Sequence, residues 1–180
     1  MKEKIKILHE RIKEEDIDIE IFSGAEIYMD IVILDLIKNN KIITINGSNK
    51  YVLIELPMGQ IPMCSEKILF VLLTGGLIPI IAHPERNHEI RKDIKRLKKW
   101  IDNGVLIQIN GGSLAGRYGT TIRKTAERLL IEGYTHSIAS DSHSSYHPFI
   151  FYKGIKRAEK LIGREEVDNM VNKNPEKILS

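Results

Sequence analysis

The chain has 180 residues, of which 42% are apolar, and its formal net charge of +3 does not indicate a dedicated nucleic-acid binder. The single cysteine, Cys64, excludes an internal disulfide scaffold and fits a reducing compartment. The longest apolar stretch, residues 68–82, is interrupted by glycine and proline and is shorter than the roughly 20 residues that span a bilayer. We therefore expect a cytoplasmic protein that binds no nucleic acid and does not insert into membranes.

Helical and strand-like patterns alternate along the chain. Residues 2–15 carry apolar side chains at helical spacing, and residues 17–25 alternate like a strand. Later strands are expected at 41–47, 51–57, 77–83, 105–110 and 135–140. Later helices are expected at 29–38, 64–74, 88–102, 119–132 and along most of the chain after residue 143. This order predicts an α/β fold with a mainly parallel sheet, and no linker or repeat divides residues 1–180 into more than one domain.

Residues that can bind a metal ion stand where the predicted strands end. The carboxyl ends of parallel strands meet at one face, so residues far apart in the sequence can converge there. The candidate metal ligands are Glu26, Glu55, His83, Asp141 and His143. Their oxygen and nitrogen donors suit Mn²⁺, Fe²⁺, Zn²⁺ or Mg²⁺. Each residue alone has a structural alternative as a turn, cap or hydrogen-bonding residue, and the pattern by itself leaves both interpretations open.

Two arginines are candidates for binding a phosphate group, because the planar guanidinium donates two parallel hydrogen bonds. Arg86 follows His83 closely, and Arg117 lies in a Gly-rich stretch, 111–119, that we expect to be a flexible loop. A solvated loop cation is the alternative for Arg117. The basic run 91–99 is expected to be the solvated face of a helix.

Other phosphate chemistries lack their motifs in this sequence. A cysteine-nucleophile phosphatase needs an arginine six residues after the cysteine, and that position here is Phe70. A phosphate-binding GxxxxGK[ST] loop and a GxSxG nucleophile motif are both absent from the sequence.

The segments IAHPERN (81–87), LIQINGGSLAGRYG (106–119) and IASDSH (138–143) resemble the CpsB/CapC-like bacterial tyrosine phosphatases of the PHP (polymerase and histidinol phosphatase) superfamily. SGAEIY (23–28), VLIELP (52–57) and NPEKIL (174–179) fit the same pattern. The resemblance implies a distorted (β/α)₇ barrel with metal ions, Mn²⁺ before Fe, Zn or Mg. It implies that the five candidate ligands hold metal and that Arg86 holds the phosphate. We expect Arg117 to serve catalysis as well, because of its residue type and its Gly-rich surroundings. The implied substrate is the phosphotyrosine tail of a kinase that regulates capsule or exopolysaccharide synthesis, and self-association is left open.

Two departures from the family pattern bear on activity. A His-x-His motif precedes the Glu26 segment in the family and is absent here, so we expect an N-terminally truncated barrel with weak or no activity by itself. His147-Pro148 stands where the family has an Arg-x-Pro-like segment. Two alternatives remain: another PHP phosphoesterase, such as a histidinol-phosphate phosphatase, or a non-catalytic remnant that serves as a binding module.

Overall fold

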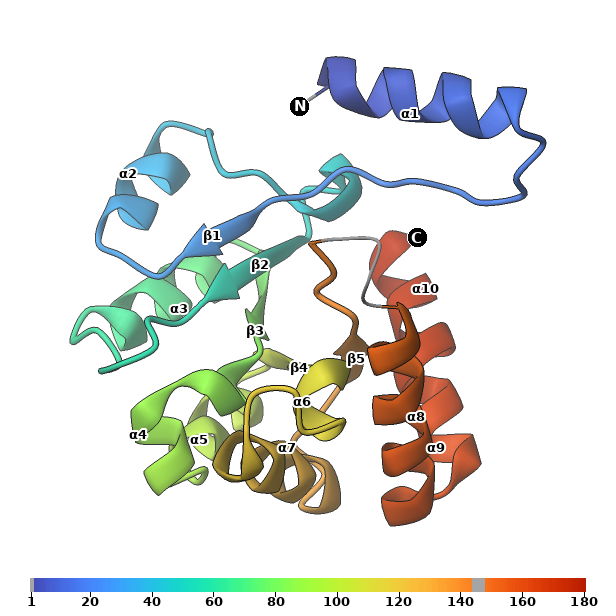
Figure 1. Cartoon of the computed structure of the whole chain (residues 1–180). Coiled ribbons are helices and arrows are strands. Elements are labelled where there is room, and N and C mark those ends of the chain that lie inside the picture. The colour runs from blue at the N-terminus through green and yellow to red at the C-terminus, as the bar shows by residue number, and fades with distance from the viewer. Residues whose placement is uncertain (1, 144–147) are drawn as a thin grey trace.

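The computed structural model describes residues 2–143 and 148–180. Within these ranges the strands form one parallel sheet in the order β1-β2-β3-β4-β5, which is also their order along the chain (Figure 1). The strands are β1 (Glu26–Tyr28), β2 (Tyr51–Glu55), β3 (Ile78–Ala82), β4 (Leu106–Asn110) and β5 (Ser137–Ala139). Sequential order with parallel pairing means that every connection crosses back to the same end of the sheet. The predicted α/β fold with a parallel sheet is therefore confirmed.

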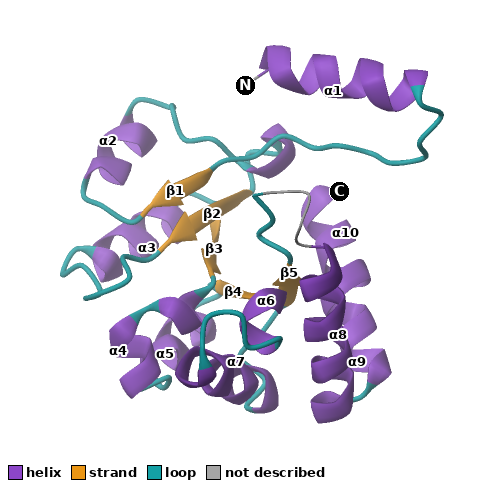
Figure 2. Cartoon of the chain, in the orientation of Figure 1, coloured by secondary structure: helices purple, strands orange, loops and turns teal. Residues whose placement is uncertain are grey.

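Helices fill the connections between the strands, and most of them lie on one side of the sheet (Figure 2). They are α1 (Lys2–Glu14), α2 (Val32–Lys38), α3 (Ser65–Thr74), α4 (His88–Lys92), α5 (Arg96–Asp102), α6 (Gly111–Leu114), α7 (Thr120–Ile131), α8 (Pro148–Ile162), α9 (Arg164–Asp168) and α10 (Asn174–Leu179). Short turns are η1 (Ile45–Gly47), η2 (Pro84–Arg86) and the π-helical η3 (Asn169–Lys173). Figure 1 shows α1 standing apart from the sheet. Among the described residues, none of these helices combines the length and the apolar character needed to cross a membrane.

The two faces of the sheet bury different sets of side chains, because side chains alternate along a strand. Val52 and Ile54 of β2 belong to the main core, which lies between the sheet and the helices. Tyr51 and Leu53 belong to a smaller cluster on the opposite face, together with Ile178 of α10. We call this opposite face, which carries Leu53, the inner face of the sheet. Glu55 comes two residues after Leu53, so its carboxylate projects from the same inner face, away from the main core.

Two predicted strands near the N-terminus are wrong. Residues 17–25 are extended but pair with no strand in the described part of the chain, and sheet pairing begins only where Glu26 aligns with Leu53. Residues 41–47 end in the turn η1, in which Asn46 has a left-handed φ of 55° and donates its N–H to the carbonyl of Ser23. The alternating apolar pattern is present in both segments, but neither has a neighbouring strand to supply hydrogen bonds.

The predicted helix 88–102 is divided into α4 and α5. Asp93 is extended at the break, and its carboxylate accepts a hydrogen bond from the N–H of Lys95, which begins a new turn. The predicted flexible loop is also wrong in its first part, because residues 111–114 form the buried helix α6. His147 lies outside the described residues.

Candidate metal centre

His83 occupies a strained backbone position directly after β3. Its φ of 31° and ψ of 52° are left-handed, and its N–H donates to the carbonyl of Gln108 on β4. Asp141, two residues after β5, also has a positive φ, of 47°. Such conformations cost about 1–3 kcal/mol in a residue other than glycine and cluster at functional sites. Two of the five candidate ligands are thus held in unfavourable backbone conformations at the same edge of the sheet.

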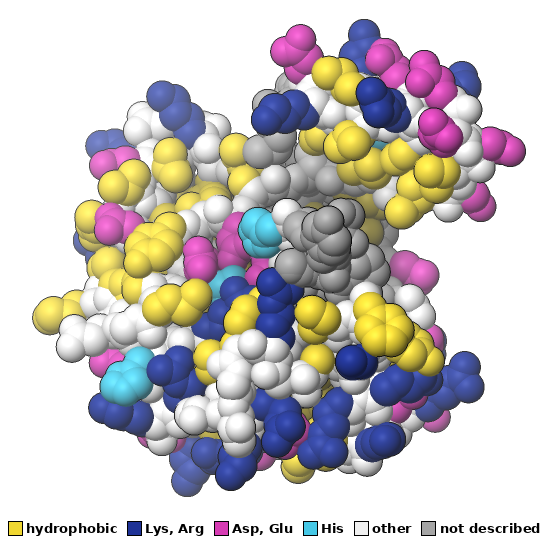
Figure 3. Space-filling model, in the orientation of Figure 1, with side chains coloured by type: hydrophobic (Ala, Val, Ile, Leu, Met, Phe, Trp, Pro, Cys, Tyr) yellow, Lys and Arg dark blue, Asp and Glu magenta, His cyan; other side chains and the backbone are white. Residues whose placement is uncertain are grey.

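Three candidate ligands converge on one point. Ligand atoms of Glu26, His83 and Asp141 all lie within 4.8 Å of one another. Nε2 of His83 is 2.9 Å from Oε1 of Glu26 and 3.8 Å from Oε1 of Glu55, so a fourth candidate borders the group. The His83 side chain is only 7% exposed, whereas the two glutamates are each 30% exposed. Figure 3 shows acidic, histidine and basic side chains close together near the centre of this face.

His143 lies beside this group and is more open to solvent. Its Nδ1 is 3.1 Å from the carbonyl oxygen of Asp141 and 3.6 Å from that residue's carboxylate Oδ1. The side chain is 83% exposed. The structure therefore places all five predicted residues at one rim, with four of them clustered and His143 at the edge.

Glu26 reaches the group from a position that we predicted incorrectly. It is the first residue of β1 and does not follow a strand. It pairs with Leu53 of β2, which lies on the inner face. The carboxylate of Glu26 therefore rises along the inner face of the sheet toward His83.

The buried environment shifts the pKa of two groups at the rim. Burial disfavours the charged form of His83, but the hydrogen bond to Glu26 and the nearby carboxylates of Glu85 and Glu26 outweigh burial and raise the pKa of His83 above its ordinary value. Glu85 is completely buried, and that burial raises the pKa of its carboxyl group. A metal ion binds only the neutral imidazole, so it would compete with the proton that Glu26 stabilises on His83.

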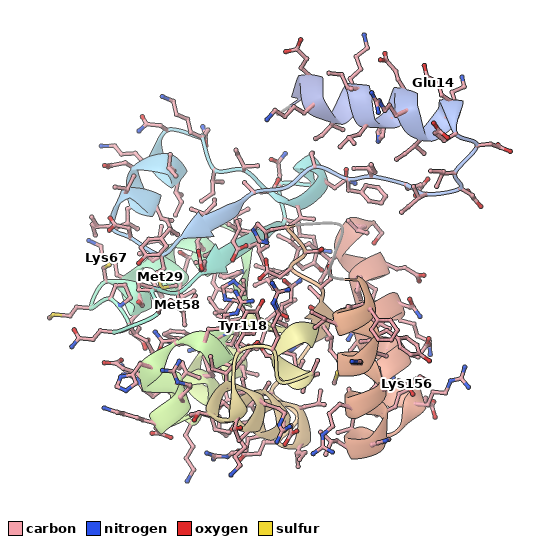
Figure 4. The ribbon with its side chains drawn as sticks, in the orientation of Figure 1. Glu14, Met29, Met58, Lys67, Tyr118 and Lys156 are labelled. Atoms are coloured by element: carbon pink, nitrogen blue, oxygen red, sulfur yellow. The ribbon has the colours of Figure 1, made fainter. Side chains whose placement is uncertain are left out.

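Arg86 connects the acidic group to an aromatic ring. Its Nη2 donates to Oδ2 of Asp141 at 2.9 Å, and its guanidinium lies 4.2 Å from the ring centre of Tyr118. Arg117 also approaches that ring, at 5.5 Å. Figure 4 places Tyr118 near the middle of the molecule, beside the loop that follows α6. The two predicted phosphate-binding arginines thus share one aromatic contact, and Arg86 is the more buried of them.

Two other residues at the rim lie outside the predicted set of metal ligands and phosphate-binding arginines. Tyr118 could have been noticed because it follows Arg117 directly in a stretch that we singled out. Asn110 was recognised as the end of a strand, and the structure shows that its Nδ2 donates to Oδ2 of Asp141 at 3.0 Å. The expected order of the strands brings both residues to one edge, although they are 31 positions apart, but it does not predict that this hydrogen bond forms.

The family model "Capsular polysaccharide synthesis, CpsB/CapC" matches residues 1–180. The chain belongs to the CpsB/CapC family. The CapC protein of Staphylococcus aureus is 39% identical in an alignment of 153 residues that covers 82% of this chain and 60% of CapC. The tyrosine-protein phosphatase YwqE of Bacillus subtilis is 33% identical over 173 residues, covering 96% of this chain and 67% of YwqE. The chain therefore spans between about three fifths and two thirds of the length of these CpsB/CapC relatives.

The fold is also similar to a solved CpsB/CapC structure. That structure comes from work on YwqE of Bacillus subtilis and CpsB of Streptococcus pneumoniae, which are described as metal-dependent tyrosine phosphatases. The superposition has a TM-score of 0.89 and 31% sequence identity, and it covers 98% of this chain and 71% of the other. The arrangement of the described strands and helices is therefore that of this family.

Proposed function

We propose that this chain takes part in metal-dependent hydrolysis of phosphotyrosine in proteins. One observation carries the proposal: Glu26, His83 and Asp141 bring their ligand atoms within 4.8 Å of one another, and Asp141 is bonded to Arg86. Carboxylate and imidazole donors grouped in this way suit a divalent cation, and an adjacent arginine suits the phosphate that such a cation acts on. The naming of YwqE and CpsB as tyrosine phosphatases supports this substrate class.

The residues present fit the metal that the relatives require. We propose that Glu26, Glu55, His83, Asp141 and His143 hold divalent cations, with Mn²⁺ first and Fe, Zn or Mg as alternatives. The donor set is rich in oxygen and the described group contains no thiolate, which suits these hard or borderline ions. A bound divalent cation supplies Lewis-acid chemistry and lowers the pKa of coordinated water.

The protein side chains bind and orient the substrate. Arg86 is held in place by Asp141 and by the ring of Tyr118, so little side-chain freedom is lost when it binds a phosphate oxygen. Arg117 is exposed beside the ring of Tyr118 and would add a second positive charge near the phosphoryl group that is transferred to water, with the tyrosine side chain as the leaving group.

We further propose the finer assignments of fold and partner. The sequential parallel sheet, with helices on one face, corresponds to part of a distorted (β/α)₇ barrel within a single domain. The proposed substrate is the phosphotyrosine tail of a bacterial tyrosine kinase that regulates capsule or exopolysaccharide synthesis, a choice supported by the family's description. The proposed location is the cytoplasm.

The proposal is tested by phosphate release from a phosphotyrosine peptide with added Mn²⁺. Because the His-x-His motif of the family is absent from this sequence, we expect release that is slow. We expect this release to be abolished by a chelator and by His83→Ala, and to exceed release from histidinol phosphate. His88→Ala is the matched control, because His88 is an exposed histidine on α4 outside the cluster. Preference for histidinol phosphate would favour the other phosphoesterase activity. Equal rates for the wild type and His83→Ala, with no bound metal, would favour a non-catalytic binding module.

A further inference from the structure

Asn110 lies at the carboxyl end of β4 and is almost completely buried, with an exposed fraction of 1%. Each polar group of this residue other than its carbonyl meets a different partner. Its backbone N–H donates to Oε1 of Glu85 at 2.9 Å, its Oδ1 accepts from the N–H of Gly112 at 2.6 Å, and its Nδ2 donates to Oδ2 of Asp141 at 3.0 Å. The residue thus joins the ends of β3, β4 and β5.

The orientation of the Asn110 amide is fixed by this arrangement. Only the amide oxygen can accept the N–H of Gly112, which is the capping bond of α6. The NH₂ group must therefore face Asp141. Gly112 itself allows this contact, since a Cβ there would lie 2.8 Å from Oδ1 of Asn110. A side chain at position 112 would displace the amide.

Asp141 receives two donors on a single oxygen. Nη2 of Arg86 is 2.9 Å from Oδ2, and Nδ2 of Asn110 is 3.0 Å from the same atom. A carboxylate oxygen has two lone pairs, so these bonds occupy Oδ2. Oδ1 is then the oxygen available to a cation, and it lies on the side of His143.

We infer that Asn110 is a positioning residue that turns the Asp141 carboxylate so that Oδ1 faces the metal. The inference rests on the proposed function, because Asp141 must be a metal ligand for its orientation to matter. Hydrogen-bond partners of metal ligands fix the ligand's orientation, and their loss typically weakens metal affinity by about 10–100-fold. A purely structural role as the cap of α6 is the competing explanation.

Serine replacement separates the two roles. Asn110→Ser keeps a good capping hydroxyl for α6 but cannot reach Asp141. Asn87→Ser is a matched control, because Asn87 is also 1% exposed, also caps a helix, and donates its Nδ2 to the carbonyls of Pro57 and Gly59. No candidate ligand is among the hydrogen-bond partners of the Asn87 side chain in the described ranges. Both variants lose amide donors inside the same rim, but only one loses a donor to Asp141.

The measurement is Mn²⁺ affinity by calorimetry on the full chain, together with the thermal midpoint. We expect Asn110→Ser to weaken Mn²⁺ binding by about 10–100-fold and Asn87→Ser to leave it near the wild-type value, although both lower the midpoint. Equal Mn²⁺ affinity in the two variants and the wild type would overturn the inference. No Mn²⁺ binding by the wild type would instead overturn the proposed function.

A second variant covers the case in which Asn110→Ser does not fold. Asn110→Asp keeps the shape and the capping oxygen but replaces the donor by an acceptor. With Co²⁺ as a spectroscopic probe, we expect its visible absorption to differ from that of the wild type, because the Asp141 carboxylate is turned. An unchanged spectrum would contradict the positioning role.

Discussion

Nη2 of Arg86 and Oδ2 of Asp141 are 2.9 Å apart, so the proposed phosphate-binding cation and a proposed metal ligand are bonded to each other. Arg86 also lies against the ring of Tyr118, which a flexible lysine would contact less well. We expect Arg86→Lys to raise KM for a phosphotyrosine peptide by about 10–100-fold, as expected for the roughly 1.5–3 kcal/mol of a charge-assisted hydrogen bond. Steady-state kinetics test this.

The control for this change is Arg128→Lys, which alters an exposed arginine on α7 that pairs with Glu132. We expect the KM of Arg128→Lys to match that of the wild type, because the Arg128–Glu132 pair is exposed to solvent and includes no residue of the candidate site. An unchanged KM in Arg86→Lys would mean that Arg86 serves only to hold Asp141.

Glu26 and His83 form the shortest contact between two candidate ligands in the described part of the chain. Glu26→Gln removes a carboxylate while preserving the side-chain shape, so we expect Mn²⁺ affinity to fall by at least about 10-fold. Without Mn²⁺, the same change should lower the pKa of His83, because the Glu26 hydrogen bond and charge now raise it. Calorimetry measures the affinity, and NMR titration of the imidazole measures the pKa.

Glu20→Gln serves as the control for Glu26→Gln. Glu20 lies in the same segment that leads into β1, but it lines a pocket formed with α1 and is not one of the candidate ligands. Its metal affinity and the pKa of His83 should stay at wild-type values. A normal Mn²⁺ affinity in Glu26→Gln would remove Glu26 from the proposed ligand set.

The central part of the fold was predictable from the sequence, because local patterns there coincide with tertiary pairing. The strands ending at Glu55 and Asn110 are short and mainly apolar in the sequence, and each has a neighbour on both sides in the sheet. Residues 17–25 alternate between apolar and polar side chains as a strand would, yet no described strand pairs with them. Periodicity reports which side chains could face a core, whereas pairing depends on segments distant in the sequence.

The candidate site was predictable to the extent that it depends on strand order. His83, Asp141 and Glu55 converge because parallel strands end at one edge, which the βα alternation implies. The contacts of Asn110 and Tyr118 depend on the buried helix α6, whose two glycines suggested a flexible loop. Gly111 is needed there because a Cβ would lie 2.6 Å from the ring of Phe151 on α8, a reason that emerges only once the helices pack.

The close approach of α6 and α8 gives a stability prediction. A Cβ on Gly154 would lie 2.0 Å from the carbonyl oxygen of Gly111, and this backbone atom cannot rotate away. We expect Gly154→Ala to reduce the free energy of unfolding by about 3 kcal/mol, the upper end of the usual cost of overpacking. Gly59→Ala is the control, because nothing lies within 4 Å of a Cβ at that loop position. Urea denaturation compares them, and equal midpoints would contradict this close approach as the reason for glycine at position 154.

His136 gives a prediction for the pH dependence of stability. Burial lowers the pKa of His136 below its ordinary value, and Nδ1 accepts a hydrogen bond from the N–H of Ile107, which requires the neutral ring. The unfolded chain therefore binds a proton more readily than the folded chain. The contribution of His136 to stability is fully present above a pH of about 6.5 and is lost as the pH falls through the lower folded-state pKa.

His136→Asn isolates this contribution, because the Oδ1 of asparagine can accept the same N–H but does not titrate. We expect the free energy of unfolding of the wild type to fall more steeply than that of His136→Asn between about pH 7 and pH 5, measured by urea denaturation at each pH. His83 has the opposite sign, since its raised pKa makes its contribution decline as the pH rises. Only the difference in unfolding free energy between the wild type and His136→Asn therefore reports on His136. If the two plots of unfolding free energy against pH were parallel, the His136 ring would be protonated as readily in the folded chain as in the unfolded one, and the prediction would be wrong.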